Sequence, residues 1–177
     1  TEMRQGALGI GSSLIYAPAS YAETPELIAL VDEAARCDGA YISHMRSEGD
    51  RLLEAIDELI AIAHATGARA EIYHFKQAGR DNWHKIDAAI ARVEAARREG
   101  LKITADMYPY IASGTGLNAR LPTWLQEGGA KAMRKRLKNP SIRKKALYEM
   151  EKGIPYKNSD PADVVITGFR LDSLNQL

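Results

Sequence analysis

The sequence lacks several features that mark specialised classes of protein. It has one cysteine, Cys37, so no disulfide can form within the chain. Because Cys37 falls at the end of a predicted amphipathic helix, we expect a buried thiol and a reducing, cytoplasmic location. No apolar run approaches the roughly 18 residues that a membrane-spanning helix needs. A membrane partner is therefore not expected.

The sequence also has almost no net charge. Its 24 Lys and Arg residues oppose 23 Asp and Glu residues, which leaves a formal charge of +1. This balance does not point to nucleic acid or to an acidic membrane surface as a partner. With 45% hydrophobic and 27% charged residues, the composition is that of a globular protein that can build one core.

A unit of strand, loop and helix repeats along the first 110 residues. Glycines stop the predicted helices, as Gly67 and Gly100 illustrate, and Pro25 stands at the first position of another helix. The apolar residues of the helices recur at helical spacing. The predicted strands cover residues 7–10, 39–44, 68–74 and 101–106, and the predicted helices begin near residue 24 and cover 52–65 and 82–98.

This alternation at a period of about 30 residues predicts βαβ units and a parallel sheet. A doubly wound open sheet is the rival architecture, but no Gly-x-Gly-x-x-Gly follows a strand. We therefore expect an α/β fold, a partial (β/α)8 TIM-like barrel of about four parallel strands plus a later strand. Its open strand edges favour a homodimer.

Three regions are expected. Residues 1–110 form the βα repeats, 111–160 a loop and a basic helical insertion, and 161–177 a return strand and a truncated end. The insertion carries nine Lys and Arg against two acids between Lys131 and Lys152, which we interpret as a solvated surface. A complete barrel needs about 250 residues. Both ends also begin or stop in polar segments beside strands, so we expect a piece, about half, of a larger barrel.

Candidate site residues stand where the predicted strands end, because parallel barrels place their active sites at the carboxyl ends of strands. His44 and His74 occupy the same place in successive repeats, and Asp106 ends the next strand. Two imidazoles from adjacent strands suit zinc. A structural role for either histidine stays open, and Asp106 either orients a loop or binds metal. No complete catalytic set is present.

Several spaced motifs stand out in the sequence: residues 6–16, 21–27, Ser-His-Met-Arg-Ser-Glu-Gly at 43–49, His-Phe-Lys at 74–76, Asp-Met-Tyr-Pro-Tyr-Ile-Ala-Ser at 106–113, and Leu-Pro-Thr-Trp at 121–124. Together they resemble the N-acyl-D-amino-acid deacylases of the amidohydrolase superfamily. The resemblance implies a metal-bearing barrel. It also implies zinc-dependent hydrolysis of the amide of an N-acylated D-amino acid to a carboxylate and a D-amino acid.

The resemblance also implies roles for individual residues. His44 and His74 would be metal ligands, and Lys76 and Tyr108 would hold the substrate's carboxylate or carbonyl. Arg46 is a further candidate that would either contact the substrate or brace the site. Ser113 is a substrate-binding candidate in a loop where Gly114 departs from the Ser-Ser-Thr stretch of the family.

Other parts of the family's constellation are missing from the sequence. The first-strand His-x-His, the cysteine ligand from an early strand and the last-strand aspartate that acts as general base have no counterpart here. We therefore expect the chain to be inactive alone, with weak or no zinc binding. Two alternatives stay open: a non-catalytic, self-associating half-barrel, and part of a cyclic-amide hydrolase of the dihydroorotase type.

Overall fold

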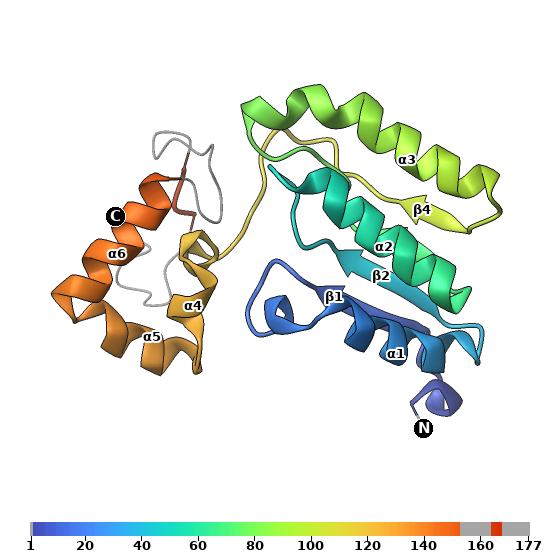
Figure 1. Cartoon of the computed structure of the whole chain (residues 1–177), viewed down its shortest axis with the longest axis horizontal. Coiled ribbons are helices and arrows are strands. Elements are labelled where there is room, and N and C mark those ends of the chain that lie inside the picture. The colour runs from blue at the N-terminus through green and yellow to red at the C-terminus, as the bar shows by residue number, and fades with distance from the viewer. Residues whose placement is uncertain (1, 153–163, 168–177) are drawn as a thin grey trace.

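A computed structural model describes residues 2–152 and 164–167 of the chain. Its centre is a four-stranded parallel sheet whose strands lie side by side in chain order (Figure 1). The strands are β1 (Gly9–Ser13), β2 (Ala40–His44), β3 (Arg69–Ile72) and β4 (Ile103–Ala105). The prediction of an α/β fold with about four parallel strands is confirmed.

Three helices connect the strands and cover one face of the sheet, as Figure 1 shows. They are α1 (Thr24–Ala35), α2 (Leu52–Thr66) and α3 (Ile86–Arg98). Pro25 stands in the first turn of α1, and Gly67 ends α2 in the left-handed conformation that favours glycine. The helix predicted over 82–98 begins instead with a 3-10 helix, Arg80–Lys85, before α3.

The hydrophobic core lies between these helices and the sheet. Every member of the buried cluster comes from residues 14–103. Alternate residues of β2, Tyr41 and Ser43, face the helices and are almost fully buried, whereas Ile42 and His44 point to the opposite face. The largest fully buried aliphatic side chains of the cluster are Val31, Leu52, Ile56, Leu59, Ile62, Ile72 and Ile103.

The first strand begins two residues later than the sequence predicted. Gly9 takes a positive φ of 152°, and a Cβ there would collide with the carbonyl oxygen of Ala40. The polar residues Ser12 and Ser13 continue the strand because they pair with Ser43 and His44 of β2. Cys37, expected to be buried, is exposed because α1 ends before it.

A helical lobe follows the sheet. It consists of α4 (Thr123–Gln126), α5 (Gly129–Leu137) and α6 (Pro140–Glu151). Asn139 caps the start of α6, where its side chain accepts hydrogen bonds from the N–H groups of Ser141 and Ile142. Of the expected return strand over 161–177, only 164–167 are described, and they form no strand.

No helix in the described part of the chain is both long and apolar enough to cross a membrane.

Candidate metal centre

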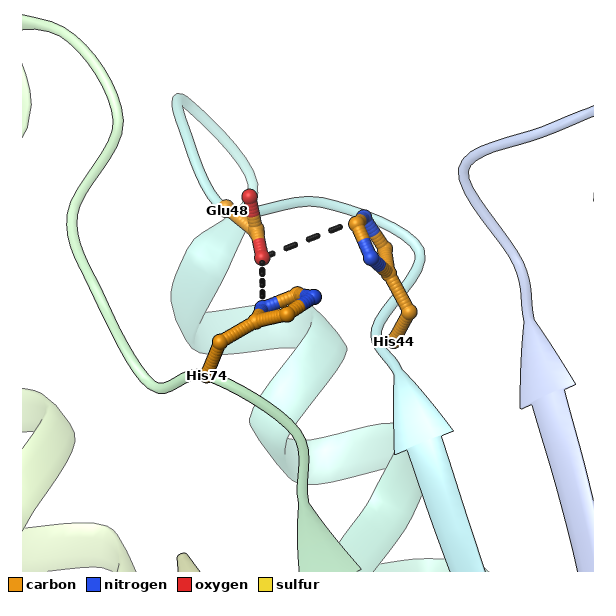
Figure 2. Close-up of side chains that lie close together, drawn as sticks. All are labelled: His44, Glu48 and His74. Atoms are coloured by element: carbon orange, nitrogen blue, oxygen red, sulfur yellow. Dashed lines mark ion pairs between the residues drawn. The ribbon is translucent and has the colours of Figure 1, made fainter. Parts of the chain in front are cut away.

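Two histidines meet at the carboxyl edge of the sheet. His44 is the last residue of β2, and His74 lies two residues after β3 ends. The parallel register aligns Ser43 with Ile72, so β2 and β3 both end at the same edge of the sheet. The two rings meet edge to face with their centroids 4.4 Å apart (Figure 2). The pairing that the sequence predicted is therefore present in the fold.

A carboxylate that sequence reasoning missed joins the two histidines. Glu48, in the loop after β2, is only 6% exposed. Its Oε1 lies 2.9 Å from His74 Nδ1 and 3.8 Å from His44 Nε2 (Figure 2). One potential ligand atom from each of the three residues lies within 4.8 Å of the others. The only sequence signal was its place four residues after His44 in the Ser-His-Met-Arg-Ser-Glu-Gly motif.

The chemistry of this group fits a metal ion. Burial, with His74 and Lys76 nearby, lowers the pKa of His44 to about 4, so its imidazole is neutral at pH 7. His44 Nε2 is buried and has no hydrogen-bond partner among the described residues. A neutral imidazole with an unused buried nitrogen, beside a carboxylate, is a donor set that zinc accepts.

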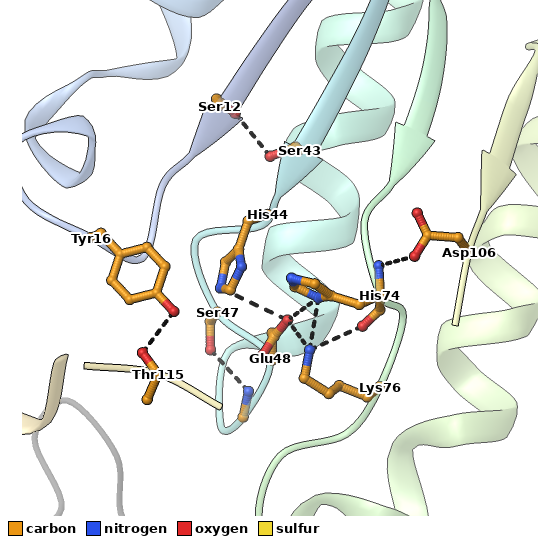
Figure 3. A network of polar contacts seen from close by, with 11 residues as sticks. Ser12, Tyr16, Ser43, His44, Ser47, Glu48, His74, Lys76, Asp106 and Thr115 are labelled. Atoms are coloured by element: carbon orange, nitrogen blue, oxygen red, sulfur yellow. Dashed lines mark hydrogen bonds and ion pairs between the residues drawn. The ribbon is translucent and has the colours of Figure 1, made fainter. Parts of the chain in front are cut away.

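Lys76 belongs to the same cluster. Its Nζ donates to Glu48 Oε1 at 2.6 Å and to the His74 carbonyl at 3.0 Å, and it lies 2.7 Å from His74 Nδ1 (Figure 3). The Nζ also lies 5.4 Å from the centroid of the Tyr108 ring. Lys76 and Tyr108, which the resemblance named as substrate-binding residues, thus stand beside the two histidines. Their contact with substrate stays a prediction.

Asp106 orients the loop that carries His74. Its Oδ1 accepts a 2.6 Å hydrogen bond from the backbone N–H of His74, as Figure 3 shows. His74 has a positive φ of 39°, an uncommon conformation for a residue with a side chain. Because Asp106 is engaged there, the geometry favours loop orientation over metal binding for this carboxylate.

Arg46 braces the loops near the histidines. Its guanidinium donates to both carboxylate oxygens of Glu58 on α2, at 2.9 and 3.0 Å. It also donates to the carbonyls of Ser20 and Ala22. These contacts occupy most of its donors, so the bracing role, one of the two considered from the sequence, is the one that the geometry supports.

Ser113 lies in an exposed loop, and within the described residues no hydrogen bond joins it to the cluster. A neighbouring residue ties this loop to the site instead. Thr115 Oγ1 lies 2.9 Å from the hydroxyl of Tyr16, whose ring centroid is 5.0 Å from that of His44 (Figure 3). A substrate contact by Ser113 stays a prediction.

An open cleft of about 360 Å³ borders the histidines. It is lined by Gly11, Ser12, Ser13, Ile42, His44, Tyr73 and His74. The cleft therefore lies over the carboxyl ends of the strands, where parallel barrels place their substrates.

The sequence matches curated deacylases over part of its length. It is 36% identical over 113 residues to N-acyl-D-glutamate deacylase of Alcaligenes xylosoxydans xylosoxydans, a match that covers 64% of this chain and 23% of the relative. D-aminoacylase of the same organism is 32% identical over 115 residues. The matched residues span about a quarter of the length of these relatives. No family model matches the sequence.

Solved structures give the same result. N-acyl-D-glutamate deacylase from Bordetella bronchiseptica, complexed with zinc and a phosphonate mimic of the tetrahedral intermediate, has 34% identity and a TM-score of 0.58, covering 59% of this chain and 22% of that chain. D-aminoacylase, described as defining a subset of amidohydrolases, has 32% identity and a TM-score of 0.60, covering 63% of this chain and 23% of that chain. Another D-aminoacylase structure concerns its binuclear metal center.

The described fold is thus a partial parallel βα barrel layer similar to amidohydrolases, and the predicted partial barrel is confirmed. The resemblance to the N-acyl-D-amino-acid deacylases is likewise confirmed over about two thirds of the chain. These relatives are hydrolases, and their structures carry metal.

Proposed function

We propose that this chain is part of a zinc-dependent amidohydrolase that cleaves the amide of N-acyl-D-amino acids to a carboxylate and a D-amino acid. The observation that carries the proposal is the group of His44, Glu48 and His74 at the carboxyl edge of the sheet. The chain is similar to deacylases over about two thirds of its length, and one of them is complexed with zinc. The unused, buried Nε2 of His44 supports metal binding.

Different residues near the cleft would bind the metal and the substrate. His44 and His74 would hold zinc, which when bound polarises a carbonyl and lowers the pKa of a water. Lys76 places a positive charge beside the histidines, which suits the carboxylate of an N-acyl-D-amino acid. Lys76 Nζ lies 5.4 Å from the centroid of the Tyr108 ring. The hydroxyl group of Tyr108 can donate to a substrate oxygen.

The chain also has limits as a catalyst. Two imidazoles and one carboxylate meet in the described residues, and Asp106, the nearby strand-end acid, is engaged with the His74 backbone. A free general base is therefore not part of this group. We propose that the activity belongs to a longer protein that supplies the base, and that the 177 residues alone are inactive.

The test is hydrolysis of N-acetyl-D-glutamate, with its L-enantiomer as control, by the protein encoded by the whole gene. Release of D-glutamate is measured by chiral chromatography. We expect release that depends on zinc. His74→Ala should abolish it, whereas His64→Ala, a change at an exposed residue of α2, should preserve it. Turnover of dihydroorotate without any N-acyl-D-amino acid hydrolysis would replace this proposal with the cyclic-amide alternative.

Self-association is the second part of the proposal. Within the described residues, nothing pairs with the outer edges of β1 and β4, and the face opposite α1–α3 has no helix over it. Leu8, Met107 and Ile111 are each more than three quarters exposed. A second copy would cover such surface, and closed two-fold dimers are the commonest oligomers. Light scattering of the 177-residue chain should give twice the monomer mass, whereas a monomer at all concentrations would contradict it.

A further inference from the structure

Glu48 makes more contacts with the neighbouring loop than a metal ligand alone would need. Besides the side-chain contacts to His74 and Lys76, its backbone carbonyl accepts a 2.7 Å hydrogen bond from the N–H of Ala78. Glu48 therefore fastens the loop after β3 to the loop after β2 through both backbone and side chain. Figure 3 shows Glu48 between the two histidines and Lys76.

His74 Nδ1 lies within hydrogen-bonding distance of one acceptor and one donor. Glu48 Oε1, at 2.9 Å, can only accept a hydrogen bond, and the ammonium of Lys76, at 2.7 Å, can only donate one. A single ring nitrogen can satisfy one of them. The choice decides which nitrogen of His74 carries the proton, and with it which nitrogen is free to bind a metal.

The remaining contacts decide the choice. If Nδ1 accepted from Lys76, its lone pair would face the Glu48 carboxylate at 2.9 Å with no proton between them. If Nδ1 instead donates to Glu48, Lys76 still has two acceptors, Glu48 Oε1 at 2.6 Å and the His74 carbonyl at 3.0 Å. Only the second arrangement leaves no pair of acceptors in contact. The rotating ammonium can turn its protons away from Nδ1, whereas the carboxylate cannot supply one.

We propose that Glu48 is a positioning residue that holds His74 in the tautomer protonated on Nδ1 and keeps Nε2 free for the metal, while it balances the charge of Lys76. The inference rests on the proposed metal centre for its purpose, but the tautomer is a property of the metal-free chain. A carboxylate that orients a ligating histidine in this way typically strengthens metal binding about ten- to hundredfold.

The test uses the 177-residue chain with nitrogen-15 in its histidine rings. Long-range proton–nitrogen spectra of the metal-free chain distinguish a protonated from a bare ring nitrogen, and His74→Gln assigns the signals. We expect a protonated Nδ1 and a bare Nε2 in the unaltered chain. In Glu48→Met, Lys76 becomes the only polar neighbour of Nδ1, and the proton should move to Nε2. In Lys76→Met, the original tautomer should persist.

Zinc affinity is measured on the same variants by competition with a chromophoric chelator. Glu48→Met should weaken zinc binding about ten- to hundredfold, and Glu48→Asp should recover part of the lost affinity. Asp50→Asn, a change at an exposed acid of the same loop, should leave the zinc affinity unchanged. A proton on Nε2 in the unaltered chain, or a tautomer that changes in Lys76→Met, would overturn the inference. If Glu48→Met does not fold, the unaltered chain and Lys76→Met still decide it.

The two proposals fail in different ways. An absence of zinc binding and deacylase activity would remove the proposed function and leave the tautomer as measured. An active, zinc-binding protein in which His74 is protonated on Nε2 would remove only the role of Glu48.

Discussion

The layer of β1–β4 with α1–α3 and the lobe of α4–α6 use their apolar residues differently. In the layer, three amphipathic helices lie against one sheet, and their buried side chains form a single cluster. In the lobe, α5 buries no residue, while α4 and α6 each bury one, Leu125 and Ala146. Stability should therefore reside in the layer, and the metal centre lies at the edge of that layer.

Polar contacts join residues far apart in the chain in both regions. In the layer, they link Glu48 with Lys76 and Arg46 with Glu58. The lobe is basic, and its contacts include Trp124 Nε1 donating to Glu149 at 2.6 Å and Lys145 lying 4.5 Å from the Trp124 ring centroid. Among the described residues, both regions contain three α-helices, but only in the layer does a sheet offer an apolar face against which the helices bury their side chains.

The largest expected effect comes from a matched pair of core truncations. Leu59→Ala on α2 should lower the free energy of unfolding by about 2–5 kcal/mol, because it opens a cavity in the main cluster. Leu125→Ala, at an equally buried leucine of the lobe, should shift the main urea transition far less. Circular dichroism during urea titration measures both, and equal shifts would mean that lobe and layer unfold as one unit.

Zinc should act on the layer alone. Because the 177-residue chain is expected to bind zinc weakly at most, the metal is added in large excess. At 100-fold above the dissociation constant, a binding site adds about 2.7 kcal/mol to stability. We expect thermal unfolding of the layer to shift upward with zinc, and His44→Ala to remove the shift. His64→Ala, an exposed histidine on α2, is the control. A zinc shift that survives His44→Ala would place the metal elsewhere.

Breaking the Arg46 brace should have a smaller, pH-dependent effect. Burial alone would raise the pKa of Glu58, but hydrogen bonds from Arg46 and Thr24 hold it below its ordinary value of 4.5. The carboxyl group of Glu58 thus binds a proton less readily in the folded state than in the unfolded chain. The contribution to stability is complete above pH 4.5 and is lost as the pH falls below that value.

Glu58→Gln should therefore cost about 1.5 kcal/mol at pH 7, the low end for a hydrogen bond to a charged group. It should also flatten the loss of stability in acid. Urea midpoints between pH 3 and 7 measure both effects, with Glu54→Gln, an exposed acid on the same helix, as control. An unchanged acid profile in Glu58→Gln would show that another carboxylate controls it.

The smallest effect is expected in the lobe. Glu149→Gln weakens the bond from the Trp124 indole, which should cost about 0.5–1 kcal/mol of local stability. In a Trp83→Phe background, fluorescence reports on Trp124 alone, and Glu151→Gln serves as control. The global transition of the layer should stay in place. A shift of that transition as large as the one from Leu59→Ala would contradict the division between the regions.

Local periodicity explains why the layer was predictable. The apolar spacing of residues 52–65 and the glycine at 67 predicted α2 almost to the residue, and two strand-end histidines predicted which residues would meet. Because neighbouring parallel strands are aligned in register, residues at the same place in successive repeats lie close together in space. The start of β1 was misplaced, because cross-strand pairing and close approach to Ala40 decide it. The 3-10 helix before α3 was predicted as part of the α-helix.

By itself, the sequence determined the order of strands and helices and the meeting of His44 with His74, because both follow from a repeating period. Only the tertiary structure decided which loop residues join them. It placed Glu48 against Lys76 and His74, turned Arg46 toward Glu58, engaged Asp106 with the His74 backbone, and left Cys37 exposed. Loops have no period, so the direction of their side chains depends on contacts between residues far apart in the chain.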